Sequence, residues 1–321
     1  MVQTQLVAVD EVKVTIIMDN TIDVFMANEE QVHRFDSCEL RANDGFSPLI
    51  AEHGFSALVQ MKCGENQKTV LLDAGVSPKG ILHNMRTLGI QMNEVQAIVL
   101  SHGHADHTLG LPALIEEIGS KNIPLMAHPD AFLERKVVFP GGREMNFSPP
   151  QEIIAPNPKK ISLVKKSDPT YLADQMLLVS GEIPRITDFE TGFPYHYTKR
   201  NGKWEHDPVI KDDQCLIVHV RGKGLVIITG CGHSGIINTL KYAQALSKVE
   251  PILAVVGGFH LTGKVFENQI PVTVAELQKI NPTYLIPGHC TGWAATQHIS
   301  QQLPEAFIPN NVGTTLIFNA N

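Results

Sequence analysis

Short apolar runs, separated by glycine, proline or polar residues, recur along the chain and predict β-strands. The run at 12–18 is rich in β-branched residues and stops at Asp19, whereas the run at 95–100 is continuously apolar, which is typical of a strand buried on both faces. The predicted strands are 12–18, 55–61, 69–72, 95–100, 123–127, 215–220, 224–229, 252–256 and 284–286. Two neighbouring pairs of these runs, joined by short turns, predict hairpins.

Helical spacing of apolar residues is clearest at 78–88, where the segment ends at Gly89, and helices are also expected at 111–118 and 236–245. Hairpins mixed with strand-helix units favour two sheets covered by helices. We therefore expect an α/β protein with a four-layer αββα sandwich, formed as a single domain over residues 1–321. A section rich in proline and glycine, at about 140–208, is predicted to be an irregular insertion.

Composition and charge narrow the class of protein. The chain is 43% hydrophobic and 18% charged, which indicates a globular protein. A net charge of −7 argues against a nucleic-acid partner or an anionic membrane partner. No apolar run approaches the roughly 20 residues that span a bilayer, and no signal region opens the chain. We expect a cytoplasmic protein with a small-molecule substrate, and the sequence leaves its oligomeric state open.

Histidine carries the clearest chemical signal. The segment His102-Gly103-His104-Ala105-Asp106-His107 follows a predicted buried strand and supplies four metal donors within six residues. Neutral imidazole and carboxylate suit zinc, iron and manganese. Residues two apart in an extended loop project to the same side, so His102 and His104 should face one ion, and Asp106 and His107 a second. The alternative is a polar loop that caps the following helix.

Three later predicted strands end in turns that also carry metal-capable residues. The strand at 224–229 ends at Gly230-Cys231-Gly232-His233, the strand at 252–256 leads to His260, and the strand at 284–286 leads to His289. The five cysteines are widely spaced and form no C-x-x-C pair, so neither a zinc ribbon nor a disulfide framework is expected. The sequence therefore predicts one polar rim where several strands end.

These motifs resemble those of the metallo-β-lactamase superfamily. Ser101 to His107, read as Ser-His-Gly-His-Ala-Asp-His, is similar to its second motif, and Asp73 in Leu-Leu-Asp-Ala-Gly is similar to the first, whose aspartate orients the metal loop. Gly288-His289 resembles the final histidine ligand. The resemblance implies metal ligands at His102 and His104 for one ion, and at Asp106, His107 and His289 for a second.

The chain departs from that pattern at two positions. Cys231 stands where the superfamily has a bridging aspartate, and it is either a thiolate ligand or a small buried residue beside a ligand at His233. Glu182 stands where the histidine that completes the first metal site is expected, and we predict that it replaces that histidine. His233 has three interpretations: a ligand, a residue of the substrate pocket, or a partner of the helix start at Ser234.

Several stretches, among them Gly257-Gly258-Phe259-His260-Leu261, are similar to the branch of the superfamily labelled 7,8-dihydropterin-6-methyl-4-(β-D-ribofuranosyl)aminobenzene-5'-phosphate synthase. A phosphorylated ligand needs cations, and Arg185 is the first candidate, followed by Arg143 and Lys264. His260 is a candidate substrate contact or proton donor, with a purely structural role as the alternative. His53 and His128 have weaker claims, and Cys290 is assigned to packing.

The expected activity is that of a metal-dependent hydrolase holding one or two Zn²⁺ ions, with iron or manganese as alternatives. A metal-activated hydroxide would attack a small ester, a phosphoester or a pterin-related phosphorylated substrate, while Asp106 manages protons. The alternative from a different class is a catalytically silent protein of the same fold that binds a pterin-like ligand.

Overall fold

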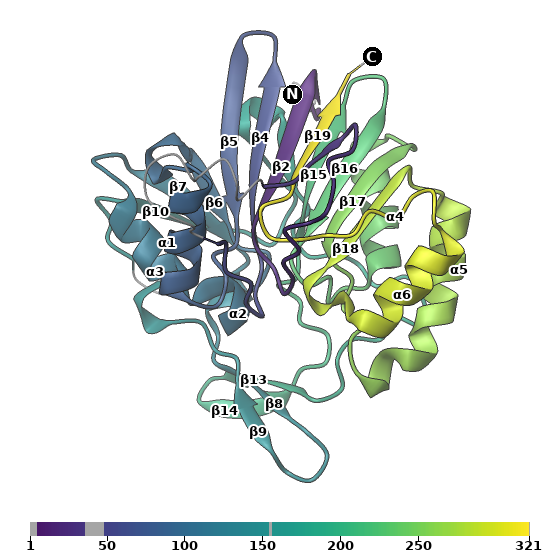
Figure 1. Ribbon diagram of the computed structural model, residues 1–321. Helices are drawn as coiled ribbons and strands as arrows, with labels where there is room; N and C mark the ends of the chain where they lie inside the picture. Colours follow the sequence, from purple (N-terminus) through teal and green to yellow (C-terminus); the bar gives the residue numbers. More distant parts are fainter. Residues whose placement is uncertain (1–4, 36–47, 154–155, 321) are drawn as a thin grey trace.

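The computed structural model describes residues 5–35, 48–153 and 156–320. Two mixed β-sheets pack face to face, and helices cover the outer face of each sheet (Figure 1). This arrangement confirms the four-layer αββα sandwich expected from the sequence. None of the helices in the described ranges combines the length and the apolar character that crossing a membrane requires.

The first large sheet has the strand order β10-β7-β6-β5-β4-β2-β19-β3 among the described residues. Its strands are β2 (Glu11–Met18), β3 (Val32–His33), β4 (Ser56–Cys63), β5 (Asn66–Leu72), β6 (Ala97–Val99), β7 (Ile123–Ala127), β10 (Ile161–Lys165) and β19 (Thr315–Asn319). Strands β4 and β5 form the predicted hairpin. Strands β5, β6 and β7 run parallel, so their carboxyl ends lie at one edge.

The second large sheet has the order β11-β12-β15-β16-β17-β18, and β1 pairs with β15. Its strands are β1 (Ala8–Val9), β11 (Thr170–Leu172), β12 (Leu177–Val179), β15 (Cys215–Val220), β16 (Gly224–Thr229), β17 (Ile252–Gly258) and β18 (Tyr284–Gly288). Strands β15 and β16 form the second predicted hairpin. Strands β16, β17 and β18 are parallel and buried, as their continuous apolar runs predict.

Side-chain alternation explains how the sheets bury their faces. Along β2, Val12, Val14 and Ile16 belong to the core between the sheets, together with Val218 and Ile228 from the second sheet. Burial of such aliphatic side chains stabilises the fold by about 1.5–3 kcal/mol each. The polar residues between them on β2 stay partly exposed, which fixes the register of the strand.

Helices cover both outer faces. On the first sheet lie α1 (Pro78–Thr87), the short α2 (Ala105–Thr108) at the sheet edge, and α3 (Leu111–Glu117). The second sheet is covered by α4 (Ile236–Ser247), α5 (Ile270–Ile280) and α6 (Trp293–Gln302). Helix α1 begins where predicted because Ser77 caps it by accepting a hydrogen bond from the Gly80 amide, and because Pro78 suits the first turn.

The section at about 140–208 is more regular than expected. It supplies edge strands to both large sheets, and part of it forms a small antiparallel sheet of order β14-β13-β8-β9. This small sheet consists of β8 (Arg135–Val138), β9 (Glu144–Asn146), β13 (His196–Arg200) and β14 (Lys203–His206). The prolines and glycines mark turns between short strands, and the small sheet lies below the ends of the large sheets in Figure 1.

Candidate metal centre

The residues singled out from the sequence converge at one rim. Asp73 follows β5, His102 follows β6, Cys231 follows β16, His260 follows β17 and His289 follows β18. Because β5 and β6 are parallel, and β16, β17 and β18 are parallel, the carboxyl ends of the strands in each set meet at one edge. The rim predicted from four strand ends is thus present in the structure.

The first set of donors, here called the Asp106 group, consists of Asp106, His107, Cys231 and His289. These four buried side chains each offer one ligand atom, and the four atoms lie within 4.8 Å of one another. His107 Nε2 is 3.1 Å from His289 Nε2 and 3.2 Å from Cys231 Sγ. Donors that surround an ion tetrahedrally at about 2.0–2.3 Å are separated by about 3.3–3.7 Å, so only a small adjustment is needed.

The hydrogen bonds of this group show which nitrogen carries the proton. His107 Nδ1 lies 2.7 Å from the Asp73 carboxylate, and His289 Nδ1 lies 3.2 Å from the Asn20 side-chain oxygen. Both acceptors require an N–H on Nδ1, which leaves the lone pairs of both neutral rings on Nε2. Two lone pairs facing each other at 3.1 Å repel unless a cation or a proton lies between them. The geometry therefore fits a metal ion.

The second set, here called the His233 group, consists of His102, Cys231 and His233. Their ligand atoms also lie within 4.8 Å of one another, and His102 Nε2 is 3.2 Å from His233 Nε2. His233 Nδ1 is buried without a hydrogen-bond partner among the described residues. Cys231 belongs to both groups, which is the position that a bridging ligand would occupy.

Asp73 holds in place the loop at 102–107, here called the metal loop. Its carboxylate accepts hydrogen bonds from the Ser101 amide at 2.7 Å, from the Ser101 hydroxyl at 2.6 Å and from His107. Asp73 itself has a φ of +56°, a strained conformation of the kind that clusters at functional sites. A side chain at Gly230 would place its Cβ 2.0 Å from Ser101 Oγ, so glycine is required immediately before Cys231.

His289 is fixed from the opposite side. Its backbone amide donates to Asp19 at 2.8 Å, and the Asn20 side chain donates to its carbonyl oxygen at 3.0 Å. The backbone φ of His289 is +48°, and that of His260 is +46°. These turns direct both rings toward the rim. Asp19 and Asn20, which follow β2, thus have a positioning role that the sequence analysis did not assign to them.

Burial sets the protonation of the histidines. It lowers the pKa of His102, His104 and His233 well below the ordinary value, and neighbouring histidines lower the pKa further. These rings are neutral near pH 7 and keep a lone pair available. Burial also raises the pKa of the Cys231 thiol well above its usual range, and the neighbouring Cys290 raises it further. A cation at Cys231 would reverse that shift and favour the thiolate.

Neighbouring charges outweigh burial in setting the pKa values of His107 and Asp106. Burial lowers the pKa of His107, but the Asp106 and Asp73 carboxylates more than offset this and raise the pKa above its ordinary value. Burial would raise the pKa of Asp106, but His107 and His289 lower it well below its usual range. The two carboxylates thus favour a positive charge at His107, whose Nε2 lies 3.7 Å from Asp106 Oδ2, and this is where a metal ion would be held.

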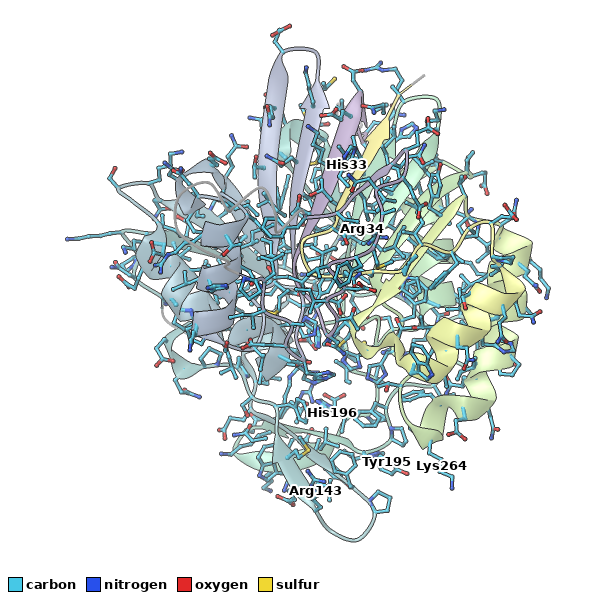
Figure 2. The ribbon with its side chains drawn as sticks, in the orientation of Figure 1. His33, Arg34, Arg143, Tyr195, His196 and Lys264 are labelled. Atoms are coloured by element: carbon cyan, nitrogen blue, oxygen red, sulfur yellow. The ribbon has the colours of Figure 1, made fainter. Side chains whose placement is uncertain are left out.

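The structure brings a histidine to the site that sequence reasoning missed. The ring of His196, at the start of β13, is buried, and its Nε2 lies 3.0 Å from His104 Nε2. Figure 2 shows His196 where the small sheet meets the body of the molecule. Burial lowers the pKa of His196 to about 4. Its section of the sequence carries no motif, and only the apolar-polar alternation of a short strand would have placed it inward.

A buried ion pair also escaped the sequence analysis. Arg135 Nη2 lies 2.7 Å from Asp212 Oδ1, and the other Asp212 oxygen accepts a hydrogen bond from the Gly103 amide at 2.8 Å. A side chain at Gly103 would clash with the Ala131 carbonyl, so the loop needs glycine there. Together these contacts fasten the metal loop to the small sheet.

Two predicted roles are corrected by the structure. Glu182 does not reach the histidines of the two donor groups. Its backbone amide bonds to the Ser167 carbonyl, and its half-exposed carboxylate lies 3.8 Å from Lys211 Nζ and 3.9 Å from His128 Nε2. Arg185 does not line the cavity, because its guanidinium donates to the carbonyl oxygens of Val209 and His233. Arg185 thus supports the turn that carries His233.

Above the metal rim lies a cavity of about 550 Å³. Its polar lining is formed by His53, His104, Asp106, Cys231, His233, His260 and Cys290. The rest of the lining is largely apolar and is formed by Val137, Phe139, Pro140, Phe147, Phe193, Tyr195, Thr262, Gly263, Lys264, Val265 and Phe266. The small sheet and its connections therefore supply a large part of the cavity wall.

The remaining candidate residues from the sequence differ in whether they reach the cavity. The ring of His260 lies 4.0 Å from that of His233, and burial lowers its pKa to about 3. His53 Nε2 is 3.8 Å from Asp106 Oδ2 at the cavity mouth. His128 instead accepts a hydrogen bond from the Asp130 amide. Of the two further cations proposed for phosphate, Lys264 lines the cavity, whereas Arg143 lies over the Phe139 ring.

Cys290 packs against the turn at Cys231, since its thiol donates to the Cys231 carbonyl at 3.0 Å. This contact agrees with the packing role assigned from the sequence. The neighbouring Gly258 leaves room for the sulfur, because a Cβ there would lie 2.7 Å from it.

Comparisons with known proteins agree with this geometry. Over 259 residues, 81% of this chain and 91% of the relative, the chain is 36% identical to an uncharacterized protein of Methanocaldococcus jannaschii. It is 31% identical to 7,8-dihydropterin-6-methyl-4-(beta-D-ribofuranosyl)-aminobenzene-5'-phosphate synthase of the same organism, over 85% of this chain and 92% of the relative.

A solved structure described as a metal-dependent hydrolase of the beta-lactamase superfamily shares the fold, with a TM-score of 0.72 and 24% identity over 96% of this chain and 99% of the other. The profile of the Metallo-beta-lactamase superfamily matches residues 50–247, which include the strand ends of both sheets from Asp73 to His233. With its motifs, its two packed sheets and this match, the chain belongs to the metallo-beta-lactamase superfamily.

Proposed function

We propose that this protein is a metal-dependent hydrolase that acts on a small substrate carrying an ester or phosphoester group attached to a flat ring system, such as a pterin-related phosphorylated compound. The observation that carries the proposal is the pair of facing Nε2 lone pairs on His107 and His289 at 3.1 Å, directly beside the Asp106 carboxylate. Neutral nitrogen donors of this kind suit Zn²⁺, with iron or manganese as alternatives.

The donor set fits one or two ions. His102, Cys231 and His233 would hold the first, and Asp106, His107, Cys231 and His289 the second. The His104 ring lies beside the first group, with its centroid 4.8 Å from that of His233, and we assign it to the first ion as a further ligand. A metal ion in such a site lowers the pKa of water to about 7 and so supplies hydroxide at neutral pH. Each of these donors is buried.

The chain's own residues assign the remaining roles. Asp106 Oδ1 is buried without a hydrogen-bond partner among the described residues, so it can accept a hydrogen bond from the attacking group and orient it. His260 is neutral near pH 7, because burial and the nearby His289 lower its pKa to about 3. A neutral imidazole is a poor acid at that pH, and we therefore assign His260 to hydrogen bonding with the substrate.

The cavity wall supports a substrate with a flat ring. Phe139, Phe147, Phe193 and Phe266 line the cavity beside the rim histidines, and aromatic rings bind flat ligands by offset stacking. Lys264 adds a positive charge that suits a phosphate. The name of the pterin-related synthase that is 31% identical to this chain is consistent with such a ligand, although a synthase is not a hydrolase.

Metal content and substrate turnover test the proposal together. Wild-type protein, His104→Ala and the distant exposed His33→Ala should be loaded with Zn²⁺, desalted and analysed for metal per chain. Each is then assayed against a phosphodiester, a phosphomonoester, a carboxylic ester, a β-lactam and a pterin phosphoester. We expect bound metal and chelator-sensitive hydrolysis of a phosphoester or ester by the wild type and by His33→Ala, and a clear loss in His104→Ala.

Two outcomes would contradict this function. Wild-type protein that holds no more metal than His104→Ala would remove its basis. Metal binding together with pterin binding, measured by fluorescence, but without hydrolysis of any substrate in the panel, would favour the alternative of a catalytically silent ligand-binding protein.

A further inference from the structure

His196 differs from the other histidines at the rim because it comes from the small sheet rather than from a strand end of a large sheet. Its ring has no exposed surface. Nε2 faces His104 Nε2 at 3.0 Å, and Nδ1 lies 2.8 Å from the Asp207 carbonyl oxygen. Both ring nitrogens are therefore in contact with a specific partner.

These two contacts fix the positions of the protons. A carbonyl oxygen only accepts hydrogen bonds, so His196 Nδ1 must carry the proton of the neutral ring, and its Nε2 must carry the lone pair. The hydrogen bond between the two rings is then donated by His104 Nε2–H. His104 consequently keeps its own lone pair on Nδ1.

His102 shows the opposite arrangement within the same loop. The Ser101 hydroxyl donates its proton to Asp73, so His102 Nδ1, 3.0 Å away, must donate to the Ser101 oxygen. This leaves the His102 lone pair on Nε2, which faces His233. The two histidines of the loop thus offer different ring nitrogens, and the partner of each ring decides which one.

We propose that His196 is a positioning residue that holds His104 in the tautomer with its lone pair on Nδ1, where it is available to a metal ion beside the His233 group, and that the small sheet is thereby coupled to the metal centre. This inference rests on the proposed metal-dependent function. Because the connections of the same sheet form the aromatic wall of the cavity, metal affinity and the placement of that wall depend on each other.

The small sheet has other attachments, which make the role of His196 separable from folding. Arg135 is paired with Asp212, and Arg200 is paired with Asp130 at 2.6 Å and with Asp207 at 3.1 Å. None of these ion pairs involves the His196 side chain. His196→Ala should therefore lose the tautomer constraint while the sheet stays attached.

The matched variants are His196→Ala, His196→Gln and His206→Ala. Glutamine restores an acceptor for the His104 N–H, whereas alanine does not. His206 lies on the neighbouring strand of the same sheet, is exposed, and has its Nε2 2.7 Å from the Pro194 carbonyl oxygen. It controls for loss of a histidine from the sheet without contact to the metal loop.

Zn²⁺ affinity is measured by competition with a chromophoric chelator, and the His104 tautomer by ¹⁵N NMR of histidine-labelled, zinc-loaded protein. We expect His196→Ala to weaken the weaker of the two zinc sites by about 10–100-fold, the effect typical of losing an outer partner of a metal ligand. His196→Gln should recover most of that affinity, and His206→Ala should match the wild type. The His104 signals should show a proton on Nε2.

The inference is overturned if wild-type protein binds zinc while His196→Ala binds it with unchanged affinity at both sites. It is equally overturned if His104 carries its proton on Nδ1. A wild-type protein that binds no zinc overturns the proposed function itself, which distinguishes the two failures.

Discussion

The Asp106 group and the His233 group share Cys231 but differ in what holds their other members. In the Asp106 group, His107 is oriented by Asp73 and His289 by Asn20, and both partners follow strands of the first large sheet. In the His233 group, His233 has a ring nitrogen without a partner among the described residues. Its turn is supported by Arg185 and Asp213, and the nearby His104 depends on the small sheet.

A metal site formed by several strands therefore need not hold all of its ligands equally firmly. Ligands whose second nitrogen is fixed by the core are preorganised, so little free energy is spent on ordering them when a metal binds. We therefore expect the Asp106 group to bind the first metal ion more tightly and the His233 group to bind the second more weakly.

Replacing His107 with alanine should have the largest effect. The variant removes a donor of the Asp106 group and leaves the buried Asp73 carboxylate without one of its partners. We expect the tighter zinc affinity to fall by at least about 100-fold, beyond the range for outer partners of a metal ligand. Chelator competition measures this, with His33→Ala as the control, and a tight site that survives in His107→Ala would contradict the assignment.

The Cys231→Ser variant tests whether the two groups share a ligand. Because the sulfur lies within 4.8 Å of donors in both groups, both affinities should fall by about 10–100-fold. Cys63→Ser, at the far end of β4, is the control. Weakening of one site alone would assign the thiol to one group, and no weakening at either site would leave His233 as the donor in its place.

Asn20→Ala should weaken the Asp106 group moderately, because it removes the acceptor that fixes the proton on His289 Nδ1. We expect about a 10-fold loss of affinity at the tighter site and no change at the weaker one. The exposed Asn93→Ala serves as the control in the same zinc titration. Equal losses at both sites would mean that Asn20 acts through general stability.

Asp213→Asn should change the pH dependence of unfolding in the metal-free protein. Burial raises the pKa of Asp213 to about 6, and its carboxylate accepts the Ser234 amide beside His233. Folding therefore favours the protonated carboxyl, and its stabilising contribution is complete below the unfolded pKa and is lost as pH rises through about 6.

Relative to Asp213→Asn, the wild type should lose on the order of 1 kcal/mol of unfolding free energy between about pH 5 and about pH 7. Urea denaturation of chelator-treated protein measures this difference. Parallel pH profiles for the two proteins would show that the Asp213 carboxyl does not titrate as its burial implies.

Local sequence patterns predicted much of the fold correctly. The runs that predicted strands became β2, β4, β5, β6, β7, β15, β16, β17 and β18, and the three predicted helices became α1, α3 and α4. Helices α5 and α6 were not predicted. Boundaries shifted by a few residues; β18, for example, continues through Pro287 to Gly288. The section at about 140–208 is more regular than predicted because its strands are short and its turns frequent. Neither the two-residue period of a strand nor the 3.6-residue period of a helix extends far enough there to be recognised.

The candidate site was predicted to the extent that its residues follow strand ends. His102 to His107, Cys231, His233, His260 and His289 all reach the rim, because parallel strands bring their carboxyl ends to one edge. Glu182 also follows a strand, but the turn at Gly181, with a φ of +65°, and the bond of the Glu182 amide to Ser167 direct its side chain to the surface.

Side-chain periodicity over a few residues was enough to predict most element types, the buried faces of the strands and the loop that gathers four donors. The contact of His196 with His104 across 92 positions, the pairing of Arg135 with Asp212 and the separation of Glu182 from the metal rim follow from the folded chain alone. Those outcomes depend on how the small sheet packs against the metal loop. Such long-range packing leaves no periodic trace in the sequence.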